Sequence, residues 1–274
     1  MTRVQRPAQR VSRAGLQHLW HSLSERDLAI LASVGACRLL TAQQIQRWHF
    51  PADARHHTQA GAERVARRVL ARLVQHRLLA RLQRRIGGVR AGSAGYVYVL
   101  GPVGHRLMDD GGPRRRTREP SPQFVDHTLA VAEVVVSLAE ADRAGAVELL
   151  EWQPEPRCWR RFQTTAGVET LKPDLRLTLA DGEQEYHWFV EVDRGTAHLP
   201  TLLGKCARYA AYYQTGQEQA AEGVFPRVAW LTTAERAKQL PAAIANDTRL
   251  PQAVFVVAAE EQWRQLLLEP GGRP

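Results

Sequence analysis

The sequence predicts a two-domain α+β protein, in which a three-helix domain with a β-hairpin precedes an α/β domain built on a mixed sheet. Three observations support this fold class. Apolar residues recur with helical spacing in three segments of the first half, and they alternate in several short segments of the second half. Residues 108–123 combine Gly, Pro, Ser and charged residues without apolar periodicity, which is typical of a linker. Most arginines lie before the end of this linker.

Charge is distributed unevenly along the 274 residues, whose net charge is +9. Residues 1–123 contain 22 arginines and no lysine against seven acidic residues, whereas residues 124–274 contain 15 basic and 21 acidic residues. A general preference for arginine explains why only three lysines occur, but it does not explain the asymmetry. A strongly basic half predicts a polyanionic partner, and we expect double-stranded DNA.

Composition also bears on where the protein works. No apolar run is long enough to span a membrane, and the basic N-terminus is not followed by the apolar segment of a signal peptide. The three cysteines are scattered, which argues against a disulfide framework or a cysteine-rich zinc site. We therefore expect a cytoplasmic protein without a membrane partner.

Three helices are expected in a first domain of residues 23–107, which follows a flexible basic arm of residues 1–22. Ser24 with Asp27 forms a capping-box-like start of the first helix, and Thr41 caps the second. Apolar stripes predict the buried sides of the first and third helices. These stripes are Leu28, Leu31, Ala32 and Gly35 in the first helix, and Val65, Val69, Leu70, Leu73 and Val74 in the third, which covers about residues 62–79.

A hairpin with strands at residues 81–86 and 96–100 follows and completes the order of a winged helix-turn-helix. In such a domain the third helix enters the major groove, and the hairpin wing lies along the DNA backbone. Guanidinium groups at both places bind phosphates, and some pair with guanine. The expected DNA contacts are Arg64, Arg67, Arg68 and Arg72 on the helix and Arg84, Arg85 and Arg90 on the wing. Two alternatives stay open: an ordinary solvated helix face, or a domain that pairs with another protein.

The second domain is expected over residues 124–274, with the order helix, three strands, helix, strand, and a final strand and helix. Its first helix covers about residues 124–144. The second strand begins with Pro-Asp, and the third ends with Glu-x-Asp. The helix that follows is amphipathic and should bury one side, formed by Leu202, Leu203, Cys206, Tyr209 and Tyr213.

The order and the two acidic motifs resemble the PD-(D/E)xK nucleases, whose domain is the restriction-endonuclease-like αβββαβ fold. The resemblance implies that Asp174 and Glu191 bind Mg²⁺ or Mn²⁺, which would activate a water and screen charge on the phosphate. Glu133 stands where such folds often carry a supporting acid. Asp193 occupies the position of the expected lysine. It is either a third metal ligand or a charge that repels the phosphate.

Lys205 is the candidate replacement for that lysine, because some members of this fold use a lysine from the helix after the third strand. Lys172 lies beside the Pro-Asp motif, so two of the three lysines are near the candidate site. The alternatives are ordinary ones: Lys205 is a surface lysine, Asp174 a turn carboxylate and Glu191 a strand-end acid. His127 is a weak candidate for the same site, and we expect a core or capping histidine in preference to a site residue.

Residues 24–233 resemble the replication-relaxation family of bacterial plasmids and integrative elements. The resemblance is strongest in KPDLRLTL and FVEVDRGTAHLPTLLGKCARYAAYY, and its most specific part is Glu191–Thr196 followed by Lys205 and Tyr209. It implies a DNA-binding protein of a mobile element, accessory to a relaxase or a replication initiator. In that family the aspartate after Glu-x belongs to the pattern, so Asp193 is not a loss particular to this chain.

Three functions are compatible with these features. The first is a DNA-binding accessory protein whose degenerate nuclease-like domain is not an enzyme and provides a homodimer or partner surface. The second is a Mg²⁺- or Mn²⁺-dependent nickase or endonuclease that uses Asp174, Glu191 and Lys205. The third is a winged-helix transcription regulator whose C-terminal domain only oligomerises or binds a partner protein.

Overall fold

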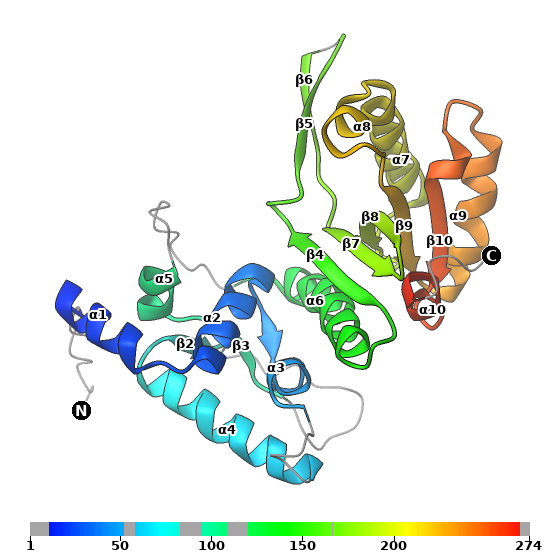
Figure 1. Ribbon diagram of the computed structural model, residues 1–274. Coiled ribbons are helices and arrows are strands. Elements are labelled where there is room, and N and C mark those ends of the chain that lie inside the picture. Colours follow the sequence, from blue (N-terminus) through cyan, green and yellow to red (C-terminus); the bar gives the residue numbers. More distant parts are fainter. Residues whose placement is uncertain (1–10, 52–57, 83–94, 109–119, 166, 269–274) are drawn as a thin grey trace, which may run out of the picture. The chain divides into compact units, whose positions relative to one another are not determined.

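The computed structural model describes residues 11–51, 58–82, 95–108, 120–165 and 167–268. The chain divides into two compact units, Met1–Ser121 and Pro122–Pro274, which we name the N-terminal and C-terminal units. Both combine helices with β-strands, so the predicted mixed α and β composition is confirmed (Figure 1). The expected wing residues, most of the expected linker and residues 1–10 of the expected arm lie outside the described residues; the wing residues are Arg84, Arg85 and Arg90.

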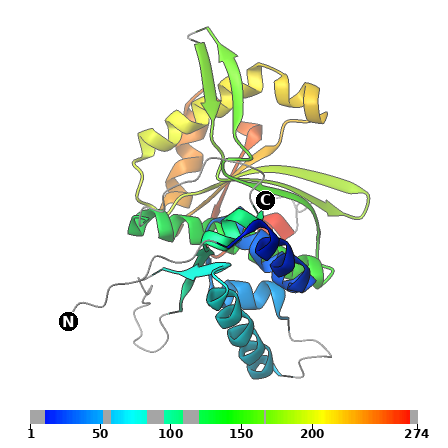
Figure 2. The ribbon, with the colours of Figure 1, turned by 90° about the vertical axis from the view of Figure 1, so that its left-hand side faces the viewer.

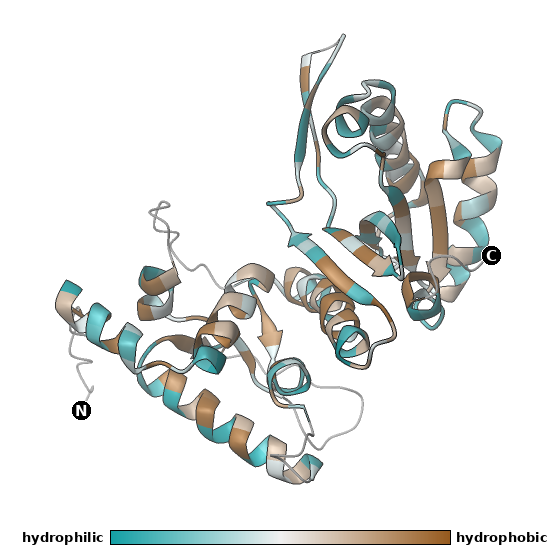
Figure 3. Ribbon diagram, in the orientation of Figure 1, coloured by the Kyte–Doolittle hydropathy of each residue, from teal (hydrophilic) through white to brown (hydrophobic). Residues whose placement is uncertain are grey.

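The N-terminal unit packs its helices around a small antiparallel sheet with the strand order β1-β3-β2. Its elements in chain order are α1 (Arg13–Ser22), α2 (Glu25–Cys37), β1 (Leu40–Thr41), α3 (Ala42–His49), α4 (Gln59–Gln75), β2 (Leu79–Arg81), β3 (Val97–Leu100) and α5 (Pro102–Met108). The helix α4 begins and ends earlier than the sequence predicts. Hydrophobic and hydrophilic residues follow each other along its length (Figure 3), as expected for a helix with one buried side.

The prediction of a flexible arm is wrong for its second half, because residues Arg13–Ser22 form α1. The hydroxyl of Ser12 caps this helix by accepting a hydrogen bond from the backbone N–H of Gly15 at 3.0 Å. Arg106 of α5 donates to the carbonyl oxygen of Val11 at 2.7 Å. The arginine content of the segment suggested disorder, whereas its cap and its contact with α5 give it order.

The helix starts in this unit follow from local sequence. The predicted capping box at Ser24 is confirmed, since Ser24 and Asp27 exchange side-chain and backbone hydrogen bonds. Thr41 caps α3 as predicted, and Gln44 completes a second capping box there. Each box satisfies two backbone N–H groups that a helix start leaves without partners.

The predicted buried stripes are only partly right. Helix α2 buries Leu31 as expected, but Leu28 is half-buried, and Ala32 and Gly35 are exposed. Its core residues are Ile30, Leu31, Val34 and Cys37. In α4 the leucines are buried as predicted, the three valines are half-buried, and Ala62 and Ala66 complete the buried side. A pattern built on large apolar side chains does not reveal buried alanines such as these.

The C-terminal unit is built on a five-stranded mixed sheet with the order β10-β9-β8-β7-β4. Its elements are α6 (Pro122–Arg143), β4 (Glu148–Pro154), β5 (Arg160–Thr164), β6 (Gly167–Leu171), β7 (Leu175–Asp181), β8 (Gln184–Val192), α7 (Leu199–Gln214), α8 (Gln217–Glu222), β9 (Arg227–Thr232), α9 (Ala234–Asn246), the 3₁₀ turn η1 (Gln252–Val254), β10 (Phe255–Ala259) and α10 (Trp263–Leu268). Strands β4, β7 and β8 pair antiparallel, whereas β8, β9 and β10 pair parallel.

Two helical layers cover this sheet. Phe189 and Trp230 pack in one core cluster with residues of α7 and α9, so these helices cover one face. Successive strand residues point to opposite faces, and α6 packs against β4 and β8 on the other side. Figure 3 shows hydrophobic residues along the inner strand β9 and the edge strand β10. On α7 the predicted buried side is wrong at Tyr213, which is exposed, whereas Tyr212 is buried.

Three elements of this unit were not predicted: the β5–β6 hairpin, α8 and α9. The hairpin extends beyond the five-stranded sheet in two perpendicular views (Figure 1, Figure 2). Among the strands that the structure describes, β5 and β6 pair only with each other. It inserts between the first and second strands of the predicted order. The hairpin is short and has few apolar residues, which left no clear alternation in the sequence.

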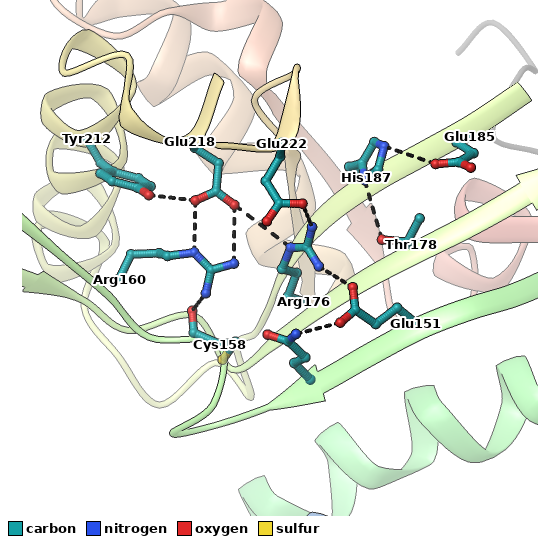
Figure 4. A network of polar contacts seen from close by, with 11 residues as sticks. Glu151, Cys158, Arg160, Arg176, Thr178, Glu185, His187, Tyr212, Glu218 and Glu222 are labelled. Atoms are coloured by element: carbon teal, nitrogen blue, oxygen red, sulfur yellow. Dashed lines mark hydrogen bonds and ion pairs between the residues drawn. The ribbon is translucent and has the colours of Figure 1, made fainter. Parts of the chain in front are cut away.

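An ion-pair network joins the base of this hairpin and α8 to the sheet (Figure 4). Arg160, at the start of β5, donates to both carboxylate oxygens of Glu218 on α8, at 2.8 and 3.2 Å. Arg176 of β7 is buried and donates to Glu151 of β4 and to Glu222 of α8, both at 2.6 Å. These ion pairs connect the β5–β6 hairpin and the strands β4 and β7 with α8.

All three cysteines are buried free thiols. Burial raises the pKa of each to about 12, so none is a reactive thiolate at neutral pH. In the part of the chain that the structure describes, no helix has both the length and the apolar composition needed to span a bilayer.

Candidate functional site

The antiparallel pairing of β7 with β8 brings the two predicted acidic motifs to one end of the sheet. Asp174 directly precedes β7, and Glu191 is next to last in β8. The backbone N–H of Asp174 donates to the carbonyl oxygen of Val190 at 3.2 Å, which extends the β7–β8 ladder to Asp174. Helix α7 brings Lys205 to the same place.

Glu191 is buried, and both of its carboxylate oxygens accept hydrogen bonds from α7. Lys205 donates to Oε2, and the hydroxyl of Tyr209 donates to Oε1 at 2.6 Å. Burial raises the pKa of Glu191 to about 8, although the charge of Lys205 opposes this effect. Burial lowers the pKa of Lys205, but the carboxylates of Glu191 and Asp174 outweigh it and raise that pKa above its ordinary value. Lys205 therefore stays protonated throughout the range in which Glu191 titrates.

Asp174 is hydrogen-bonded through both of its oxygens as well. The backbone N–H of Val192 donates to Oδ2 at 2.8 Å, and Nε2 of His127 lies 3.2 Å from Oδ1. Burial raises the pKa of Asp174, but the hydrogen bond with His127 and the charge of Lys205 outweigh it and hold that pKa below its usual value. The bond to Asp174 in turn raises the pKa of His127. His127 of α6, the weak candidate, therefore contacts Asp174 and is not merely a core or capping histidine.

The other two expected acids are bound elsewhere. Asp193 accepts hydrogen bonds from the hydroxyl of Thr232 at 2.7 Å and from the backbone N–H of Gly195 at 3.0 Å. Nε of Arg236 lies 3.7 Å from the same carboxylate. Asp193 thus fixes the chain after β8 to β9 and α9.

Glu133 is engaged on α6 and α10. Ser137 donates to it at 3.3 Å, and Arg264 lies 3.5 Å away. Asp174, Glu191, Lys205, Tyr209 and His127 are connected by hydrogen bonds and by the charge of Lys205 near Asp174, and we name them the acidic-pair cluster.

All carboxylate oxygens of the acidic-pair cluster have partners within the protein. Mg²⁺ needs near-octahedral oxygen ligands at about 2.0–2.1 Å, but all four carboxylate oxygens of Asp174 and Glu191 already have donors or a histidine nitrogen from the protein. Among the residues that the structure describes, no group of three or more His, Cys, Asp or Glu side chains is arranged to hold a metal ion. A metal ion bound by Asp174 and Glu191 would have to share or displace these partners.

Helix α4 presents the arginines that the sequence predicts for DNA, with one exception. Arg64, Arg67 and Arg68 are exposed, and no carboxylate of the described residues lies within ion-pair distance of them. Arg67 bonds only to the carbonyl oxygen of Glu63 at 3.3 Å. The exception is Arg72, whose guanidinium donates to both oxygens of Asp27, at 2.6 and 2.7 Å.

Arg72→Ala is expected to lower the free energy of unfolding by about 2 kcal/mol, because Asp27 is buried and would lose a charged hydrogen-bond partner. Urea unfolding of the full-length protein measures this change. Arg64→Ala is the matched control on the same helix and should change stability by less than about 0.5 kcal/mol. Equal effects of the two substitutions would contradict a structural role of Arg72.

Two members of the acidic-pair cluster had no assigned role in the predicted site. Tyr209 belongs to the most specific part of the family resemblance, but its side chain was assigned to the apolar side of α7, although it lies four residues after Lys205 and therefore on the same side of the helix. That spacing could have revealed it. His127 is 47 residues from Asp174 along the chain, and no local pattern connects the two.

Comparison with known proteins gives one family match. The family model for replication-relaxation matches residues 31–228, which is more than half of the chain. No match was found among curated proteins or among solved structures. The matched segment includes α4, both acidic motifs and the whole of α7. The chain belongs to the replication-relaxation family.

Proposed function

We propose that this protein is a DNA-binding accessory protein of a mobile genetic element, which acts in plasmid replication, DNA relaxation or mobilisation. Its N-terminal unit is a winged helix that binds double-stranded DNA, and its C-terminal unit is a PD-(D/E)xK-like domain without nuclease activity. Family membership supports the biological setting. A relaxase or a replication initiator is the partner that this role requires, and the C-terminal unit provides a surface for that partner or for a second copy.

The order of elements in the N-terminal unit supports the winged-helix assignment. Helices α2, α3 and α4 with the strands β1, β2 and β3 follow the order of that fold, and α4 stands in the position of the recognition helix. The observation that carries the proposal is the exposed side of α4. Arg64, Arg67 and Arg68 point away from the buried Ala62 and Ala66 side and have no acidic partner among the described residues.

The donors of the acidic-pair cluster support a C-terminal unit without metal chemistry. In a nuclease of this type the two carboxylates must offer free oxygens to the ion. Here Lys205 and Tyr209 occupy those of Glu191, and His127 and a backbone N–H occupy those of Asp174. We infer that the cluster has a structural role, in which its hydrogen bonds connect α6 and α7 to the sheet.

Removing the two adjacent arginines of α4 tests the DNA contact. Arg67→Ala/Arg68→Ala should weaken binding to duplex DNA by at least about tenfold and reduce the slope of log K against log salt by about 2, since each lost phosphate contact contributes about 0.9. Fluorescence anisotropy over a salt series measures both. The control Lys238→Ala/Arg249→Ala removes the same charge from two exposed positions of the C-terminal unit. Equal affinities of the two double variants would refute α4 as the recognition helix.

The alternative, a metal-dependent nickase, has one observation in its favour: Lys205 contacts Glu191, as a catalytic lysine of that fold would. Incubation with supercoiled plasmid and Mg²⁺ or Mn²⁺ decides between the two functions. We expect the plasmid to stay supercoiled. Nicking that EDTA, Asp174→Ala and Glu191→Ala each abolish would establish the enzyme and overturn the accessory role of this unit.

A further inference from the structure

A second group of basic side chains lines a pocket of the C-terminal unit, with a volume of ≈ 380 Å³. The end of β6 and the residue after it form one side, and a face of α7 forms the other. The lining residues are Glu169, Thr170, Leu171, Lys172, Lys205 and Arg208. Lys205 is ion-paired with Glu191, so Lys172 and Arg208 supply the positive charge that favours an anionic ligand.

The positive charge at this pocket contrasts with the acidic excess of the C-terminal unit. Residues 124–274 carry more acidic than basic residues, yet α7 contains no acidic residue along its whole length. Two of the three lysines of the chain, Lys172 and Lys205, lie in this pocket. Arg208 follows Lys205 by three residues, so both lie on the same side of α7.

Two of the cations are held in position before any ligand arrives. Nζ of Lys172 lies 4.7 Å from the ring centre of Trp159, a cation–π contact that leaves the ammonium at the pocket. Lys205 is fixed by Glu191. Arg208 is exposed, and within the described ranges no acidic side chain forms an ion pair with it. Its planar guanidinium remains available to bind a phosphate through two hydrogen bonds.

We propose that this pocket binds the phosphodiester backbone of DNA, as a contact separate from α4. The proposal rests on the proposed function in taking DNA as the anion. A metal is not needed for it, because the nearby carboxylates of Asp174 and Glu191 are buried and hydrogen-bonded within the protein. The cations of the pocket can therefore act on a phosphate without first neutralising an exposed acid pair.

The test compares two charge-matched double variants of the full-length protein. Lys172→Gln/Arg208→Gln removes two pocket cations, and Lys238→Gln/Arg249→Gln removes two exposed cations elsewhere. The probes are a fluorescein-labelled duplex of about 20 base pairs and the matching single strand, each titrated over a salt series. The pocket variant should bind at least one probe about tenfold or more weakly, with a salt slope lower by about 2 on a duplex or about 1.4 on a single strand. The control should change by less than about threefold.

A third variant distinguishes the loss of a DNA contact from the loss of a folded protein. Glu169→Gln removes the one acidic side chain of the pocket, and it should strengthen binding about threefold, which a damaged fold would not produce. If the pocket variant matches the control on both probes, or if Glu169→Gln does not strengthen binding, the proposal is overturned.

The experiments distinguish a failure of the proposed recognition helix α4 from a failure of the proposed phosphate-binding pocket. Loss of affinity in the pocket variant with none in Arg67→Ala/Arg68→Ala would refute the recognition helix and keep the pocket. The reverse pattern would keep the recognition helix and refute the pocket.

Discussion

Replacing Lys205 by methionine is expected to lower the free energy of unfolding by about 3 kcal/mol at pH 9, because it leaves the buried carboxylate of Glu191 without its cation. Methionine keeps most of the side-chain volume, so the loss reports the charge and not a cavity. Urea unfolding followed by tryptophan fluorescence measures it. Lys238→Met, on the exposed surface of α9, is the control and should change stability by less than about 0.5 kcal/mol.

The pH dependence of this loss follows from the pKa of Glu191. Burial raises that pKa to about 8 in the folded protein, so Glu191 keeps its proton below this value and loses it above. Lys205 lowers the pKa of Glu191, so in Lys205→Met the folded-state pKa is higher still. The folded variant then binds a proton that the folded wild type has released, and its deficit grows as pH rises above about 8. A deficit that shrinks between pH 7 and pH 9 would contradict this account.

A double variant separates the charge from the packing. Glu191→Gln/Lys205→Met removes both charges and keeps an acceptor for the hydroxyl of Tyr209. It should be more stable than Lys205→Met alone at pH 9, because no buried charge is left without a partner. If the double variant loses as much free energy of unfolding as the two single variants together, the two side chains are energetically independent. The structural role proposed for their contact would then be wrong.

Replacing Arg176 by methionine is expected to cost about 4 kcal/mol. Its side chain is 3% exposed and contacts three carboxylates, of which Glu218 is itself 2% exposed. Removing one partner of a buried ion pair costs about 3–5 kcal/mol, because the remaining charge stays desolvated. The variant keeps Arg160 and the hydroxyl of Tyr212 on Glu218, so the loss should come with local loosening of α8 and of the β5–β6 hairpin.

Two measurements check the prediction for Arg176. Urea unfolding gives the change in stability, and limited proteolysis reports loosening of the hairpin and α8. Glu151→Gln is the control within the same network; its side chain is 47% exposed, so it should cost less than about 1 kcal/mol. Equal effects of Arg176→Met and Glu151→Gln would mean that burial does not determine the strength of this network.

Several elements could be predicted because short sequence signals, such as helix caps and turn residues, determine where an element begins or ends. The capping boxes at Ser24 and Thr41 determine where α2 and α3 begin, and the turn at Gly182 separates β7 from β8. Helix α9 was missed because Pro241 lies inside it, and a proline within a helical pattern normally argues for its end. The β5–β6 hairpin was missed because it pairs with itself and has little apolar surface to pattern.

The candidate site could be predicted only where local sequence signals determine the positions of its residues. Asp174 and Glu191 could be placed together because strand order and motif position determine where strand ends meet. Lys205 required knowledge of the fold as well as the sequence. His127, and the partners that bind Asp193 and Glu133 elsewhere, depend on how separate helices pack against the sheet. Side chains that meet across such packing leave no periodic signal in the chain.

The hydrogen bonds of Asp174 and Glu191 connect elements that are far apart in the chain. His127 lies on α6, Asp174 precedes β7, and Lys205 and Tyr209 lie on α7. A substitution at one of these positions leaves a buried partner on another element without its hydrogen bond, so its effect depends on the residues at the other positions. We therefore expect the acidic-pair cluster to tolerate coordinated substitutions better than single ones, whereas the exposed arginines of α4 can change one at a time.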